Sequence, residues 1–160
     1  MNGKETMTAL HELAKRYADE YVSRLAELSP DAKTERKALL IQKNMAEICA
    51  VFPKYEYNGH IYETREKQVF GQNNHYFDAY RRTYDSLDAD EREAFLIYAA
   101  AITLARCNFY DKRKAELDCG EGTAESVFEA RLICGVVGQI LDDWCAWWRQ
   151  NFPHIDIGGV

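Results

Sequence analysis

The pattern of apolar and polar positions is dominated by one long run, Ala94–Phe109, which reads AFLIYAAAITLARCNF. Arg106 is its only charged residue. A run of this length without regular polar positions is typical of a helix that is buried on most sides. The preceding segment, from Asp88 to Glu91, has the form of a capping box in which Asp88 caps and Glu91 holds the third helical position. We therefore predict a long central helix that reaches about Leu117.

Four further helices are predicted from apolar residues that recur at steps of three and four. The first begins near Thr6 or Thr8 and runs to about Leu28. The segment Ser29–Asp31 is a typical helix start, because it offers a capping serine, a proline for the first helical position and an acid for the positive end of the dipole. Pro53 ends the second helix. After the first helix, the predicted spans are 30–52, 74–87, 88–117 and 123–150.

Strips of small residues, at steps of four on the last helix and of seven and four on the central helix, predict which two helices pack together. The strips are Ala94, Ala101 and Ala105 on the central helix and Ala130, Cys134 and Gly138 on the last helix. Small side chains allow two helix backbones to approach each other closely. We therefore predict that the central and last helices pack face to face.

One passage, residues 54–64, has the pattern of a β-hairpin. The pair Asn58-Gly59 lies between alternating residues and is a favoured two-residue turn, because both positions need a positive φ. The register opposes Glu56 to Ile61. Four side chains then share one face: Tyr55, Tyr57, His60 and Tyr62. An isolated two-stranded hairpin is marginal in water, so we expect this aromatic face to contact the core and to leave an exposed rim.

Together these elements predict a mainly α fold, a single-domain bundle of about five helices. One β-hairpin, at about 54–64, is inserted between helices two and three. A length of 160 residues suits one domain with a sizeable core. We assign residues 1–160 to this helical domain and expect the tail at 152–160, which contains Pro153, to be irregular.

Composition disfavours several classes of function. With 26 acidic and 20 basic residues the formal charge is −6, so bulk charge would not hold a phosphate backbone and direct nucleic-acid binding is unlikely. No run approaches the roughly eighteen apolar residues of a membrane span, and the N-terminus lacks the apolar core of a signal peptide. Five cysteines without a Cys-x-x-Cys pair argue against a disulfide framework and favour a cytoplasmic location.

Arg149 and His154, separated by four residues at a predicted helix end, are the sharpest catalytic candidate. The pair resembles the Arg-x4-6-His signature of the HEPN ribonucleases, an all-helical family, and the resemblance covers six residues. It implies that His154 acts as general acid and base while Arg149 stabilises the phosphate.

Metal and cofactor motifs are incomplete in this chain. His75 and Asp78 lie three residues apart on the predicted third helix, but no second helical pair completes a di-metal site. The glycine-rich segments Cys119–Gly122 and Cys134–Gly138 lack the lysine and the strand of a phosphate-binding loop. We predict no metal and no cofactor.

Three features favour a protein partner. The first is the aromatic hairpin face. The second is a group of acids at one helix junction, Asp88, Asp90 and Glu91, which would speed association with a basic partner. The third is Trp147, which lies off the main apolar stripe of the last helix, where tryptophan is a common interface anchor.

The sequence therefore favours a non-enzymatic protein-binding module, an inhibitor or adaptor of phage or mobile-element type. The candidate contact residues are Tyr55, Tyr57, His60, Tyr62, Asp88, Asp90, Glu91 and Trp147. The alternative is a small helical ribonuclease that uses Arg149 and His154. The identity of the partner is left open, as is the formation of a homodimer through the apolar last helix.

Overall fold

The computed structural model describes residues 1–28, 31–51, 55–57, 59–71 and 77–157, with the side chains at 48–51 and 57 left out. The helices and strands, in chain order, are α1 (Gly3–Leu28), α2 (Ala32–Val51), β1 (Glu56–Tyr57), β2 (His60–Ile61), α3 (Arg65–Phe70), α4 (Arg81–Asp85), α5 (Ala89–Leu104), α6 (Lys112–Cys119) and α7 (Ala124–Asn151). A 3-10 turn, Asp78–Tyr80, precedes α4, and a π-helical segment, Ala105–Asp111, joins α5 to α6. The predicted mainly α fold with one inserted hairpin is confirmed.

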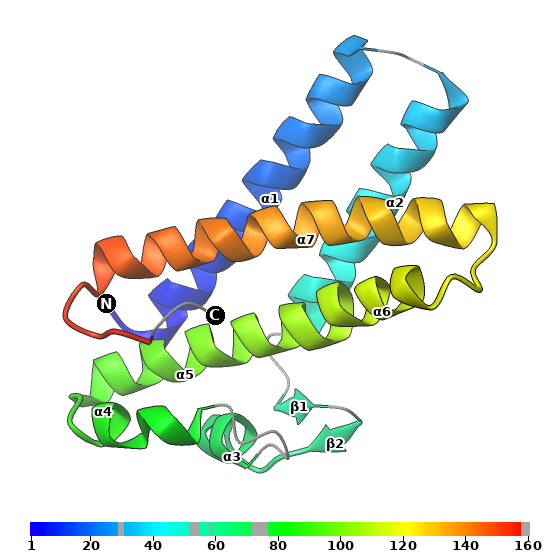
Figure 1. Cartoon of the computed structure of the whole chain (residues 1–160). Helices are drawn as coiled ribbons and strands as arrows, with labels where there is room; N and C mark the ends of the chain where they lie inside the picture. Colours follow the sequence, from blue (N-terminus) through cyan, green and yellow to red (C-terminus); the bar gives the residue numbers. More distant parts are fainter. Residues whose placement is uncertain (29–30, 52–54, 58, 72–76, 158–160) are drawn as a thin grey trace.

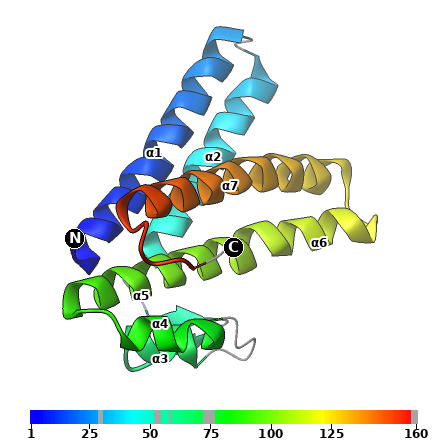
Figure 2. The same cartoon turned by 60° about the vertical axis from the view of Figure 1, so that its left-hand side comes forward.

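The helices are arranged around α5. The antiparallel pair α1 and α2 crosses the bundle steeply, and one end of this pair projects beyond the other helices (Figures 1 and 2). Helix α7 runs along the line formed by α5, the π segment and α6 (Figure 1). Helices α3 and α4 and the two strands lie on the opposite side of α5 from α7 in both views. The hairpin is therefore connected to the core through α3 and α5.

Two predicted helix starts are confirmed by their hydrogen bonds. At α5, Glu91 N donates to Asp88 Oδ1 at 2.8 Å, and Asp88 N donates to Glu91 Oε1 at 3.5 Å, which completes the capping box. At α7, Ser126 N donates to Thr123 Oγ1 at 3.1 Å. Both starts could be predicted because the capping residue and its target lie only three positions apart.

One other helix start was placed too late, and a second falls partly outside the described residues. Helix α1 begins at Gly3, several residues before the expected start, because Asn2 Oδ1 accepts a hydrogen bond from Glu5 N at 2.9 Å. Helix α2 begins at Ala32, and Asp31 Oδ1 accepts from the N–H of the third helical residue at 2.9 Å. Ser29 and Pro30, which we expected to begin α2, and Pro53, which we expected to end it, lie outside the described residues.

The segment between the hairpin and the central helix was also predicted incorrectly. Residues 65–70 form the helix α3, in the interval between the predicted hairpin and the helix expected at 74–87, where no element was predicted from the sequence. Thr64 caps it by accepting from Lys67 N at 3.1 Å, and its short apolar surface is buried. Within the expected helix 74–87 the described part contains only the 3-10 turn and α4, and residues 74–76 lie outside it. Helices this short have no periodic signature that a sequence window can detect.

The π segment is where α7 comes closest to the central helix. A Cβ atom on Gly138 would lie 3.4 Å from the Tyr110 ring, and Cys134 Sγ lies 3.6 Å from the Tyr110 carbonyl O. The predicted packing of the two helices is therefore correct for the π segment and α6. Along α5 large side chains span the gap, as in the stack of Tyr98 on Trp148 with ring centroids 4.5 Å apart. A π turn adds a residue and re-aims the side chains after it.

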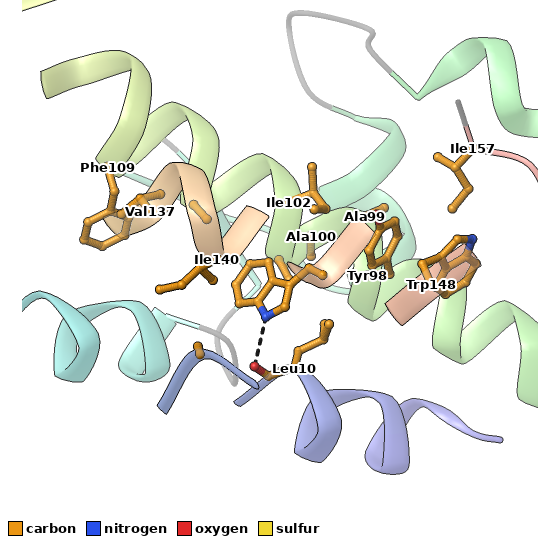
Figure 3. Close-up of a cluster of buried hydrophobic side chains, with 14 of the residues drawn as sticks. Leu10, Tyr98, Ala99, Ala100, Ile102, Phe109, Val137, Ile140, Trp148 and Ile157 are labelled. Carbon is orange, nitrogen blue, oxygen red and sulfur yellow. Dashed lines mark hydrogen bonds between the residues drawn. The ribbon is translucent and has the colours of Figure 1, made fainter. Parts of the chain in front are cut away.

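The core lies where α1, α5 and α7 meet (Figure 3). Trp144 is fully buried there, and its Nε1 donates to the Leu10 carbonyl O at 2.9 Å, which joins α7 to α1. Figure 3 shows Tyr98 beside Trp148, and Ile140 near the tryptophan that bonds to Leu10. Burial of aromatic side chains of this size makes a large contribution to stability.

The tail after α7 has no regular secondary structure up to residue 157, as predicted, but its apolar side chains are buried. Phe152, Ile155 and Ile157 are each at most 4% exposed. Trp148 Nε1 donates to the Ile155 carbonyl O at 3.0 Å. The described tail is thus part of the core, which its proline and polar residues did not indicate.

Replacing Gly135 by alanine is expected to raise the free energy of unfolding by about 0.5–1 kcal/mol, because a mid-helix glycine loses more backbone entropy on folding than alanine. A Cβ atom at this position would meet no atom within 4 Å. The matched control is Gly120→Ala, which also has open space but has a φ of 70°. That variant is expected to lower stability by about 1 kcal/mol. Urea titration measures both changes, and a destabilised Gly135→Ala would contradict this packing of α7.

Candidate functional site

The hairpin has the register that the sequence predicts. The antiparallel pairs are Glu56 with Ile61 and Tyr57 with His60. Tyr62 N also donates to the Tyr55 carbonyl O at 2.7 Å, which extends the ladder beyond the two strands. Gly59 has a φ of 79°, a value that glycine adopts without strain. Asn58, the other predicted turn residue, lies outside the described residues.

Gln68 attaches the hairpin to α3. Its side chain is fully buried, and its Nε2 donates to the Glu56 carbonyl O at 2.7 Å. Its Oε1 accepts from Arg65 Nη1 at 2.8 Å. Helix α3 in turn packs on α5, where the rings of Phe70 and Phe95 stack with centroids 6.2 Å apart. The hairpin is therefore held against the core at a fixed position.

The hairpin exposes an apolar and an aromatic side chain. Ile61 is 76% exposed and Tyr55 is 40% exposed, and His60 is also exposed. We call Tyr55, His60 and Ile61 the hairpin surface. Tyr62 is half-buried, with its ring edge-on to His60 at 4.4 Å, and the Tyr57 side chain lies outside the described part. Because side chains alternate along a strand, Ile61 lies on the same face as Glu56, opposite Tyr55 and His60, so the hairpin surface includes both faces of the hairpin. Exposed apolar and aromatic side chains of this kind are typical of a binding surface.

A cavity of about 390 Å³ lies beside the hairpin surface, between Tyr55, the start of α1 and α5. Met7, Leu96 and Ile97 form its apolar wall. Arg65 lines it as well, with its guanidinium carbon 4.7 Å from the centre of the Tyr55 ring. Burial lowers the pKa of Arg65. The cavity could accept an apolar side chain of a partner while the Tyr55 ring covers one edge.

The predicted acidic junction is largely engaged within the protein. Asp88 and Glu91 form the capping box, and Glu91 Oε2 also lies 2.5 Å from His154 Nε2. Asp90 is exposed. The contact between Glu91 and His154 joins the start of α5 to the tail after α7, which the sequence did not predict. Only Asp90 among the three predicted acids therefore has its carboxylate on the surface without one of these contacts.

Trp147 lies at the edge of the core, where α7 ends and the tail begins. It is half-buried, and its ring centre lies 6.5 Å from that of Trp148 and 6.1 Å from that of Phe152. Phe152 also lies beside His154, with ring centres 6.5 Å apart, so Trp147 packs against the start of the tail. Its contacts are those of a residue that completes the core, with one side left to solvent.

Arg149 borders a hollow that His154 does not line. Arg149 is exposed and borders a hollow of about 280 Å³ together with Cys145 and Asp156. His154 is not among the described residues that line this hollow, and its Nε2 faces Glu91. General acid and base catalysis requires a ring nitrogen within hydrogen-bond reach of the reacting group. The ribonuclease hypothesis stays a prediction from the sequence.

The described residues form neither a metal-ligand grouping nor a membrane-spanning helix. No group of three or more His, Cys, Asp or Glu side chains in these ranges is placed to hold a metal ion. His75, one of the two candidate ligands, lies outside them. Of the helices in the described ranges, none has both the length and the apolar character needed to cross a membrane.

No protein-family model, curated protein or solved structure matches this chain. Function is therefore inferred from the geometry of the described residues.

Sequence reasoning missed three residues that shape the hairpin surface. Arg65 and Gln68 lie between the predicted elements, and their roles depend on the contact between α3 and the hairpin, which the sequence pattern does not contain. Ile61 was placed on the face opposite the aromatic residues. Because Ile61 shares that face with the charged residue Glu56, the sequence already indicated that Ile61 is an exposed apolar side chain.

Replacing Gln68 by leucine is expected to release the hairpin from α3 and to lower the free energy of unfolding by about 1–3 kcal/mol. The reason is that the Glu56 carbonyl and the Arg65 guanidinium each lose a buried partner while the side-chain volume is kept. Amide hydrogen exchange at residues 59–62 should become faster. The control is Gln139→Leu, which removes an exposed glutamine that donates to Asp143. Unchanged exchange in the hairpin would show that Gln68 does not hold it.

Proposed function

We propose that this protein is a protein-binding module, an inhibitor or adaptor, that contacts its partner through the hairpin surface. The observation that carries the proposal is the exposure of Ile61 and Tyr55 on a hairpin that the buried Gln68 holds in place. A fixed, exposed apolar group costs little conformational entropy when a partner covers it. The adjacent cavity of about 390 Å³ offers room for one side chain of that partner.

The partner that suits this surface carries an apolar anchor, and the net charge of the chain favours a basic partner. Glu56 lies opposite Ile61 in the hairpin, while the cavity itself is lined by Glu93 together with the cations Lys4 and Arg65. The whole chain has a formal charge of −6. Complementary charges around an apolar contact raise the association rate and disfavour acidic competitors.

The proposal is tested with Ile61→Asp, because the new carboxylate would be desolvated in the interface. Purified wild-type protein is used to capture partners from the native host, and the affinity of the captured protein is then measured with both forms. We expect at least a tenfold weaker affinity for Ile61→Asp, which is a loss of about 1.4 kcal/mol or more. Leu28→Asp is the matched control, because Leu28 is 83% exposed on α1. Equal affinities for wild type and Ile61→Asp would remove the hairpin from the interface.

The same proteins also separate this proposal from the ribonuclease alternative. If the chain is a binding module, the double replacement of Arg149 and His154 by alanine should leave partner affinity unchanged and should alter no RNA cleavage. Loss of an RNA-cleaving activity in that variant would instead support the enzyme.

A further inference from the structure

A second hollow, of about 400 Å³, lies between α1, the first half of α2 and the start of α7. Three of its lining side chains are cationic, namely Lys33, Lys37 and Arg131. Tyr21 and Phe128 supply aromatic walls. We call this hollow the basic pocket. It is formed by helices other than those that carry the hairpin.

The three cations of the basic pocket, Lys33, Lys37 and Arg131, have no ion-paired carboxylate among the described residues. The neighbouring Glu125 is engaged with Arg36, whose Nη1 lies 3.2 Å from its Oε1. Although acidic residues outnumber basic ones in the chain, which has a net charge of −6, three cations line the same hollow.

This clustering has a cost that the Phe128 ring offsets only in part. Like charges four residues apart on a helix, such as Lys33 and Lys37, destabilise it by roughly 0.2–0.5 kcal/mol. Both ammonium groups lie near the Phe128 ring, at 5.6 and 5.8 Å from its centre, and Arg36 lies at 5.2 Å. Cation–π contacts at exposed sites contribute about 0.5–1 kcal/mol. A bound anion would remove the repulsion and would face a field focused by the apolar walls.

We propose that the basic pocket binds a small organic anion that carries two or more negative charges and an aromatic ring, of the kind represented by a nucleoside phosphate. The three cations would contact the charged group, and the ring would lie against Phe128. The volume of about 400 Å³ falls within the range of about 300–1,000 Å³ that is usual for small-ligand sites. That size favours a small molecule over a strand of nucleic acid or an acidic protein segment, which would extend well beyond the hollow.

The test is a titration of the full chain with ADP by calorimetry, with adenosine, inorganic phosphate and pyrophosphate as separate probes. We expect ADP to bind at least tenfold more tightly than any of these three, because only ADP offers both the charge and the ring. Raising the salt concentration should weaken the binding. Pyrophosphate binding as tightly as ADP would contradict the role of the ring. Absence of ADP binding would overturn the proposal.

Variants locate the site. The double variant Lys37→Gln with Arg131→Gln is expected to bind ADP at least tenfold more weakly, while Lys43→Gln, an exposed lysine on the same helix, should bind it like the wild type. Phe128→Leu keeps an apolar wall and is expected to reduce the advantage of ADP over pyrophosphate. Unchanged ADP affinity in the double variant, or binding of an oligonucleotide or acidic peptide but not of ADP, would overturn the proposal. Thermal unfolding of each variant, and the gain in melting temperature with ADP, verify that the protein tested is folded.

Discussion

Replacing Trp144 by alanine is expected to lower the free energy of unfolding by about 3–5 kcal/mol, a large part of the stability of a domain of this size. The side chain is 0% exposed at the crossing of α1 and α7. Its loss leaves a cavity and removes the hydrogen bond from Nε1 to the Leu10 carbonyl O, which is 2.9 Å long. Because this bond joins α7 to α1 in the centre of the core, we expect the whole fold to lose stability. Denaturant titration followed by circular dichroism measures the change.

The variant Trp144→Phe separates the two contributions of this side chain. It keeps most of the apolar volume and removes the donor, so we expect a smaller loss of about 1–2 kcal/mol relative to the wild type. A loss below 1 kcal/mol in Trp144→Ala would contradict the placement of this residue in the centre of the core.

Phe95→Ala is expected to lower stability by a similar amount, about 3–5 kcal/mol, but through a different part of the fold. Phe95 is 0% exposed and lies on the side of α5 that faces α3 and α4. Its ring centre is 5.6 Å from that of Tyr84, 6.2 Å from that of Phe70 and 6.3 Å from that of Phe77. Without this ring, α3 and α4 lose their main contact with the central helix, and the hairpin loses its support.

Hydrogen exchange distinguishes this effect from that of Trp144. In Phe95→Ala, amides of α3 and α4 should exchange faster at denaturant concentrations where α7 remains protected, because the loss is local. Phe95→Leu is the control, since it keeps much of the apolar volume and should cost less. Uniformly faster exchange in α7 and α3 would argue that the two sides of α5 unfold as one unit.

The elements that could be predicted from the sequence are those fixed by local rules. The capping box of Asp88 and Glu91 and the cap at Thr123 join residues three positions apart, and both are present. The hairpin register followed from the Asn-Gly turn and was correct. In each case the physical cause lies within a few residues, so the pattern in the chain contains it.

The elements that could not be predicted depend on distant contacts. Helix α3 is six residues long, which is too short for a periodic pattern, and it is stabilised by its contact with α5. The tail is irregular in sequence, yet Ile155 is buried because Trp148 lies beside it after the chain has folded. The small-residue strips predicted the contact of α7 with the central helix, but the π turn that re-aims Tyr110 has no signature in the sequence.

The candidate surfaces show the same division. Tyr55 and His60 could be selected from the pattern of the hairpin, whereas their support by Gln68 required the fold. Lys33 and Arg131 are nearly a hundred residues apart in sequence and meet at one hollow only because α2 and α7 pack together. Conversely, the acidic junction was predicted to be a partner-binding surface, but the Glu91 carboxylate contacts His154 and accepts a hydrogen bond from Asp88 N in the capping box.

The most direct test of the hairpin as an interface is hydrogen–deuterium exchange of the purified protein with and without its captured partner. We predict slower exchange at residues 59–62 and 93–97 in the complex, because these segments border the hairpin surface and its cavity. Exchange in the middle of α7 should not change. Protection that is confined to the junction at residues 88–91, or to any other surface, with none at 59–62, would contradict the account.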